Sequence, residues 1–225
     1  MKHTEQELIA LRSEINQMWQ LVISQLTKAK QAYLNHDVEL AREVVGREKR
    51  VDAFELKIDS DGENYIALFS PVAIDLRLVL SLIKISGMLE RIADFAESIA
   101  RNVIKNELHE IDKKVREELR LEQMFDIVIS MLSDSFVALE SENAKLSGKI
   151  LAKDEEVDAI YHDAVPILAK FMQADADYII PGIRTMLIIR KIERIGDHCS
   201  NIVEEIVFYI DAKVLKHAGV KNKQI

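Results

Sequence analysis

Apolar residues recur at helical spacing along almost the whole chain of 225 residues. A period near 3.6 is typical of amphipathic helices. The stretch FSPVAID interrupts the pattern once, and the polar segment NELHEID interrupts it again. The pattern therefore predicts an all-α protein with six long helices. These helices are expected to span residues 4–34, 38–68, 71–106, 112–141, 144–173 and 176–214.

Several residues are typical of helix ends. Asp37 and Asn143 are expected to act as N-caps for the helices over 38–68 and 144–173, because a short oxygen-bearing side chain can accept a hydrogen bond from a free backbone N–H. Pro71 is suited to the first turn of the helix that follows it. The basic tail has no clear apolar stripe, so we expect residues 216–225 to be flexible.

Two segments of the chain occur twice. The sequence REKRVDAFE at 47–55 is similar to KDEEVDAIY at 153–161. LERIADFAESIA at 89–100 is similar to IERIGDHCSNIV at 192–203. Self-similarity of this kind indicates a duplicated structural unit. We therefore predict two three-helix repeats, over residues 1–108 and 109–215.

The composition supports helices and limits the possible functions. Seven Gly and three Pro are too few for the many turns of a β-sandwich or barrel. A net charge of −8 argues against direct binding to nucleic acid and favours attraction of cations. The single cysteine, Cys199, excludes an internal disulfide. Neither a signal-peptide core nor an apolar run of about 18 residues is present, so we expect a cytoplasmic protein.

Each repeat carries the same acidic spacing twice. An acidic residue is followed four positions later by an aspartate, and residues four apart share one face of a helix. The pairs are Glu48 and Asp52, Glu90 and Asp94, Asp154 and Asp158, and Glu193 and Asp197, with Asn201 continuing the last row. One such row is commonly a solvated face paired with arginine, and Arg91, Arg101, Arg190 and Arg194 are available. The fourfold recurrence instead favours sites for hard cations, which bind carboxylate and amide oxygens.

Other candidate residues have a structural explanation. His198 lies about 100° around the helix from Asp197, and a single helical histidine is more often a packing or surface residue than a ligand. Cys199 and Trp19 lie on apolar helix faces and are expected in the core. Asp75 and Arg77 are expected to cap and pair locally at the start of their helix.

The repeated segments carry a resemblance to a known family. RIADFAESIARN, RIGDHCSNIVEEIVFYI and PVAIDLRLVLSLIKI, in their duplicated arrangement, resemble PhoU-type regulators of phosphate signalling and transport. The resemblance implies two antiparallel three-helix bundles side by side. It also implies bound metal ions, most often iron, with zinc, manganese or magnesium as alternatives. Its motif falls on Glu48, Asp52, Glu90, Asp94, Asp154, Asp158, Glu193 and Asp197, with Asn201 as an added ligand.

The two repeats differ within this motif. Ser98 stands where the second repeat has Asn201, and Ala93 stands where it has Gly196. Serine is a shorter and poorer neutral oxygen donor than asparagine. We therefore expect the second repeat to bind metal better than the first.

The resemblance also implies a function. It implies a cytoplasmic, non-enzymatic signal-transduction protein that restrains phosphate-starvation responses and phosphate uptake. The implied partners are a phosphate sensor histidine kinase and the ATPase of a phosphate ABC transporter, and the implied assembly is a homodimer. No catalytic triad or nucleotide-binding loop is present in the sequence.

Two other functions remain as alternatives. A carboxylate-bridged di-metal enzyme or metal-storage bundle would also be helical and lined by acids. Those bundles normally carry Glu-x-x-His on two helices. No glutamate lies three positions before His36, His109, His162, His198 or His217. A purely structural bundle is the third possibility, and it predicts no bound metal.

Overall fold

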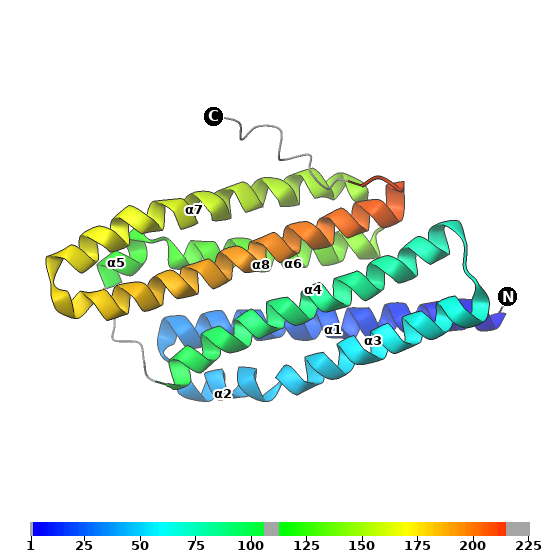
Figure 1. The fold of residues 1–225 in the computed structure, drawn as a ribbon, viewed down its shortest axis with the longest axis horizontal. Coiled ribbons are helices and arrows are strands. Elements are labelled where there is room, and N and C mark those ends of the chain that lie inside the picture. Colours follow the sequence, from blue (N-terminus) through cyan, green and yellow to red (C-terminus); the bar gives the residue numbers. More distant parts are fainter. Residues whose placement is uncertain (1, 106–112, 215–225) are drawn as a thin grey trace.

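The computed structural model describes residues 2–105 and 113–214, and within these ranges the chain is helical, without strands. Figure 1 shows two helical bundles lying side by side. The first bundle contains α1 (Lys2–Asn35), α2 (Val38–Gly46), α3 (Glu48–Phe69) and α4 (Ala73–Ile104). The second contains α5 (Lys113–Glu118), α6 (Leu121–Glu140), α7 (Ser147–Ala174) and α8 (Ile179–Asp211), with short 3₁₀ turns η1 (Ala144–Leu146) and η2 (Ala176–Tyr178).

The predicted all-α fold with a tandem repeat is confirmed. In the first bundle α4 packs against α1 and α3, and in the second α8 packs against α6 and α7. The bundles meet where α4 lies against α8 and α1 against α6 (Figure 1). The predicted join near residue 108 and the predicted tail over 216–225 lie outside the described residues.

The prediction of one helix over 38–68 is wrong, because the chain turns at Arg47. The Arg47 N–H donates to Val44 O at 3.2 Å, and this bond to the third residue before it closes the tighter ring of a 3₁₀ turn. Gly46 precedes this turn, and glycine is a poor residue for a helix interior. Hence α3 begins at Glu48, which is the first residue of the first acidic row.

The predicted helix over 112–141 is also divided. Arg120 lies between α5 and α6 in the left-handed conformation, with φ of 53°. This conformation costs an ordinary residue roughly 1–2 kcal/mol. An ion pair between Arg120 and Asp163 on α7 anchors the turn to the next helix. The apolar period continues across the break, since Leu119 and Leu121 are both buried.

The predicted N-cap at Asp37 is confirmed, whereas Asn143 caps η1 and α7 itself begins after Leu146 without a side-chain cap. Pro71 and Arg77 are also placed differently. Asp37 Oδ1 accepts from Leu40 N at 2.9 Å, and Asn143 Oδ1 accepts from Lys145 N at 3.1 Å, at the turn leading into α7. Pro71 lies in the connection before α4 instead of in its first turn. The expected local pairing of Arg77 is wrong, because its Nε donates to Tyr209 O on α8.

The core extends from one bundle into the other. Trp19 is fully buried, as predicted, and its Nε1 donates to Leu132 O on α6 at 3.1 Å. Cys199 is also fully buried, as predicted. Ser81 Oγ on α4 donates to Glu205 O on α8 at 3.2 Å. Shared packing of this kind fixes the two acid-bearing helices α4 and α8 against each other. None of the helices within the described ranges is long and apolar enough to cross a membrane.

Candidate metal centres

The acidic rows lie on two pairs of packed helices. α3 carries Glu48 and Asp52, and α4 carries Glu90 and Asp94, so we call these four residues cluster 1. α7 carries Asp154 and Asp158, and α8 carries Glu193 and Asp197, which together form cluster 2. The helices α3 and α4 pack together, as do α7 and α8. The structure thus brings the predicted residues into one acidic group in each bundle.

Burial and mutual repulsion disfavour the charged carboxylates of cluster 1. Burial, followed by the negative charge of Asp94, raises the pKa of Glu90 to about 7, although nearby Arg91 opposes this rise. Burial and the neighbouring Asp52 also raise the pKa of Glu48. Such shifts mean that the fold holds these groups close together at an electrostatic cost, which a bound cation would reduce.

Cluster 2 shows the same effect. Burial raises the pKa of Asp154 to about 6, and the charges of Asp158 and Asp197 add to this rise. The pKa of Glu193 is raised by burial and then by the charges of Asp197 and Asp158. Asp197 itself has a raised pKa, again mainly from partial burial and then from the charge of Asp158. The shared influence of these charges shows that carboxylates of α7 and α8 face one common region.

A glycine allows the closest approach in cluster 2. An ideal Cβ placed on Gly196 would lie 2.9 Å from Asp154 Oδ1 and 3.4 Å from Val157 Cγ1. Any larger residue at this position would have to displace the Asp154 carboxylate. The first repeat has Ala93 at the matching place, and this alanine is buried. The close contact between helix backbone and carboxylate is therefore a feature of the second repeat.

The clusters also differ in their arginine contacts. Arg91 Nη1 lies 3.4 Å from Asp94 Oδ2, and its Nε lies 3.7 Å from Glu90 Oε2. Arg190 and Arg194 act on cluster 2 from farther away, where their charges partly oppose the rise in the pKa of Glu193. In the described part of the chain, no lysine or arginine forms an ion pair with a carboxylate of cluster 2. The alternative of an arginine-paired acidic face therefore applies better to cluster 1.

Two carboxylates near cluster 1 were not among the predicted ligands. The charge of Glu97 raises the pKa of Glu48, and Glu97 is itself paired with Arg101 at 2.6 Å. Glu55 has a pKa raised first by burial and then by the charges of Asp59 and Asp52. Both glutamates lie three positions beyond an aspartate of the row, and residues three apart on a helix also share a face.

The second repeat has a serine, Ser200, where the first has Glu97. The Ser200 hydroxyl is close enough to Asp154 to oppose part of the rise in its pKa. However, Ser200 Oγ is buried and makes no hydrogen bond of acceptable geometry. An unsatisfied buried oxygen beside a carboxylate is consistent with a site that can accept another group.

Asn201 and His198 flank cluster 2 on α8. Asn201 is exposed and lies one turn beyond Asp197, as its position in the acidic row predicts. The His198 ring lies 5.9 Å from the Phe95 ring on α4, at the contact between the bundles. Burial lowers the pKa of His198, which favours its neutral form. This position agrees with the expected packing role.

The donor atoms of the clusters fit a hard cation in kind. Carboxylate and amide oxygens are the usual ligands of such ions. No three His, Cys, Asp or Glu side chains within residues 2–105 and 113–214 are arranged closely enough to hold a metal ion as they stand. Side chains of each row would have to rotate toward one point. Cluster 2 fits better than cluster 1, because the described residues form no ion pair with its carboxylates and Gly196 makes room for the Asp154 carboxylate.

The fold and the clusters define a class of protein: an all-α chain of two tandem bundles, each with acidic rows on two packed helices. The model of the PhoU domain family matches residues 15–103 and 121–206. The match includes the acidic rows of both repeats. The chain belongs to the PhoU family.

Relatives and solved structures agree with this assignment. The chain is 34% identical over 222 residues to the phosphate-specific transport system accessory protein PhoU of Edwardsiella tarda, covering 97% of this chain and 90% of the relative. It is 32% identical over 213 residues to the protein of the same name from Escherichia coli K12, covering 95% and 87% of the two chains. The crystal structure of PhoU from Pseudomonas aeruginosa matches with a TM-score of 0.87 at 30% identity, over 93% of this chain and 99% of that one.

Proposed function

We propose that this protein is a negative regulator of phosphate-starvation signalling and phosphate uptake. The observation that carries the proposal is the family match across both repeats, together with relatives named as accessory proteins of a phosphate-specific transport system. A solved structure that covers 94% of this chain, from Streptococcus pneumoniae, is named as a phosphate transport system regulatory protein.

The proposed mode of action is protein contact in the cytoplasm, without catalysis. The partners are a phosphate sensor histidine kinase and the ATPase of a phosphate ABC transporter, and the acting form is a homodimer. Long packed helices present broad, rigid surfaces suited to such contacts. The core shared by the bundles supports this mode of action, because a displacement of α8 would also move α4, which packs directly against it.

We further propose that cluster 2 binds a hard metal ion and that cluster 1 binds one more weakly. Asp154, Asp158, Glu193, Asp197 and Asn201 would hold the ion in the second repeat, with iron, zinc, manganese and magnesium as candidates. The ion would supply positive charge that offsets the repulsion between carboxylates of α7 and α8. The residues themselves would then fix the relative placement of these two helices, and so the shape of the surface offered to a partner. A bound ion changes the balance between two conformations of this surface only if it binds them with different affinities.

The proposal is tested in a strain that lacks the gene, grown in ample phosphate. We expect phosphate-starvation genes to be expressed constitutively and phosphate uptake to remain high. The wild-type chain supplied in trans should restore repression of both. Unchanged regulation in the deletion strain would reject the proposed function. Metal-dependent substrate turnover by the purified protein would instead support the enzyme alternative.

A further inference from the structure

A pocket lies between the start of α1 and the end of α3, at the end of the first bundle where the N-terminus is found (Figure 1). Its volume of about 370 Å³ is within the size range of small-molecule sites. His3, Glu7 and Leu11 line it from α1, and the α3 side of the lining runs from Asp61 to Phe69. The acidic row of cluster 1 begins at the other end of α3, so this pocket is separate from the candidate metal centre.

An ammonium group of the protein already lies beside the pocket. Lys57 Nζ is 2.6 Å from Asp61 Oδ2 and 2.6 Å from Glu14 Oε1, so two carboxylates share this one cation. Hydrogen bonds to Asp61 and then to Glu14 raise the pKa of Lys57, which keeps its ammonium group charged. Glu7 lies about two turns before Glu14 on the same face of α1. No lysine pairs with Glu7 within the described residues.

The negative charge at the pocket is only partly neutralised by the protein. In the described part of the chain, Glu7 is paired with His3, whose Nδ1 lies 3.7 Å from Glu7 Oε1 and which is charged only when protonated. Lys57 offsets one of the two carboxylates that share it. Burial raises the pKa of Tyr65, and the negative charge of Asp75 on α4 adds to this rise. Carboxylates therefore outnumber cations here, which favours a positively charged ligand.

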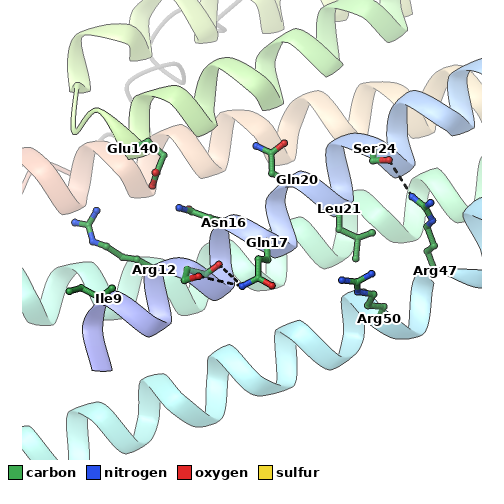
Figure 2. Close-up of a pocket in the computed structure, with 11 residues that line it drawn as sticks. Ile9, Arg12, Asn16, Gln17, Gln20, Leu21, Ser24, Arg47, Arg50 and Glu140 are labelled. Atoms are coloured by element: carbon green, nitrogen blue, oxygen red, sulfur yellow. Dashed lines mark hydrogen bonds between the residues drawn. The ribbon is translucent and has the colours of Figure 1, made fainter. Parts of the chain in front are cut away.

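The larger hollow between α1, α3 and α6, shown in Figure 2, has a different balance of charge. Two of its three arginines are paired with glutamates outside its lining. Arg50 and Glu140 then remain as opposite charges on its surface. That hollow favours neither sign of ligand, whereas the pocket between α1 and α3 favours a cation.

Aromatic rings form part of the pocket wall. The ring centroids of Tyr65 and Phe69 are 5.2 Å apart, and the His3 ring meets the Phe69 ring edge-on at 5.8 Å. Aromatic faces attract organic cations. Leu11 and Leu68 also line the pocket and offer apolar contact to an alkyl chain. This combination suits an alkylammonium ion better than a hydrated metal ion, which has no apolar part.

Tyr65 also offers a hydrogen-bond acceptor. The residue is only 4% exposed, yet it lines the pocket. Its hydroxyl makes no hydrogen bond within residues 2–105 and 113–214. A tyrosine that is so deeply buried usually hydrogen-bonds through its hydroxyl. An ammonium ligand would supply the missing donor.

We propose that this pocket binds a primary alkylammonium group. The charged nitrogen would lie among Glu7, Asp61 and the Tyr65 hydroxyl, with the alkyl chain against Phe69 and Leu68. A free amine and a lysine side chain of a partner protein both present this chemistry. The inference goes beyond the proposed regulatory role, because it adds a ligand site that neither acidic cluster contains.

The test uses full-length protein labelled with ¹³C on its tyrosine rings and titrated with pentylammonium chloride. The NMR signals of the Tyr65 ring are assigned by their loss in Tyr65→Phe. We expect these signals to shift saturably with a Kd of about 1 mM, and the affinity to fall as salt is added. Neutral 1-pentanol, which has nearly the same shape, and anionic pentanoate should each bind at least about tenfold more weakly.

Variants locate the binding on the protein. Glu7→Gln should weaken pentylammonium binding by about fivefold or more, because it removes the carboxylate that has no lysine partner. Asp61→Asn should weaken it by about two- to threefold, since Lys57 already shares this carboxylate. Glu5→Gln is the matched control: Glu5 is exposed on the same helix outside the pocket lining, so this change should alter the affinity by less than about 1.5-fold. Thermal melts confirm that each variant is folded.

The two sources of the ammonium group are distinguished by Nα-acetyl-lysine methylamide. Tighter binding of this compound than of pentylammonium would assign the pocket to a lysine of a partner protein. Weaker binding would assign the pocket to a free amine.

Three results would overturn the proposal. The first is no saturable shift of the Tyr65 signals up to about 20 mM pentylammonium. The second is equal affinity for pentylammonium and 1-pentanol, which would identify an apolar cleft. The third is an equal loss of affinity in Glu7→Gln and Glu5→Gln, which would show a general attraction of amines to an acidic surface.

Discussion

Gly196 on α8 lies directly against Asp154 on α7, so that an added Cβ would come within 2.9 Å of the Asp154 Oδ1 atom. The two residues come from different helices of the second bundle. Their contact brings a carboxylate onto the backbone of the helix that carries Glu193 and Asp197. It also distinguishes the second repeat from the first, where Ala93 occupies the matching position.

Replacing Gly196 should weaken cation binding without a matching loss of stability. In Gly196→Ala, the new methyl group displaces the Asp154 carboxylate, and we expect Mn²⁺ affinity measured by calorimetry to fall by about tenfold. Alanine is also a better helix former than glycine by about 0.5–1 kcal/mol. Stability measured in a chelator should therefore fall little or not at all. Ala93→Gly is the comparison variant, and it should reduce stability without weakening the tighter Mn²⁺ site. A Gly196→Ala protein with wild-type Mn²⁺ affinity would remove the assigned role of this contact.

The two clusters should contribute unequally to metal content. Replacing Glu193 and Asp197 with alanine should remove more bound metal than replacing Glu90 and Asp94. Arg91 pairs with both of the latter, whereas no described lysine or arginine pairs with cluster 2, which also has Asn201 nearby. The measurement is elemental analysis of protein purified without chelator or affinity-tag metal. Equal losses from the two pairs, or a greater loss from cluster 1, would contradict this ranking.

The raised carboxylate pKa values predict a particular pH dependence. Glu90 has a pKa of about 7 and Asp154 about 6, both above the usual carboxyl range. The folded state therefore binds protons more tightly than the unfolded state. The stabilising contribution of these groups is present below about pH 4 and is lost as pH rises toward 7.

This dependence is measured as a difference between proteins, because other groups titrate in the same range. Urea unfolding in a chelator should show that Glu90→Gln/Asp154→Asn gains stability relative to wild type as pH rises from about 4 to 7. Added Mn²⁺ should stabilise the wild type more at pH 7.5 than at pH 5, since protonation competes with binding. A difference that is constant with pH would show that the two carboxyl groups are not perturbed in the folded protein.

Removing an ion pair between the two bundles should reduce the stability of the protein. Lys84 Nζ on α4 lies 3.1 and 3.2 Å from the carboxylate oxygens of Glu205 on α8, and Glu205 is only 4% exposed. Lys84→Met leaves this buried carboxylate without its partner. Because Lys84 is itself half exposed, we expect a loss on the order of 1–3 kcal/mol in chemical denaturation. Lys84→Arg keeps the charge and should lose less. Equal stability of Lys84→Met and wild type would show that the pair contributes nothing.

Much of the fold was predictable because helical periodicity persists along the chain. The breaks at Arg47 and Arg120 were not, since each depends on the conformation of one or two residues while apolar positions continue on both sides. The positions of the acidic rows were predictable, because the same spacing of four residues recurs in both repeats. The contact between Gly196 and Asp154 was not, because it depends on how α7 and α8 approach each other. Arg50 on α3 and Glu140 on α6 line one surface hollow only in the folded structure, because they come from different bundles.

We propose that the carboxylates of cluster 2 control the surface through which the protein regulates phosphate responses. The most direct test of this claim is phosphate-starvation reporter expression in the deletion strain grown in ample phosphate and complemented with Glu193→Ala/Asp197→Ala at wild-type abundance. We expect constitutive reporter expression, with repression retained by the matched Glu117→Ala/Glu118→Ala variant on α5. Full repression by the cluster 2 variant, with a folded and abundant protein, would contradict the claim.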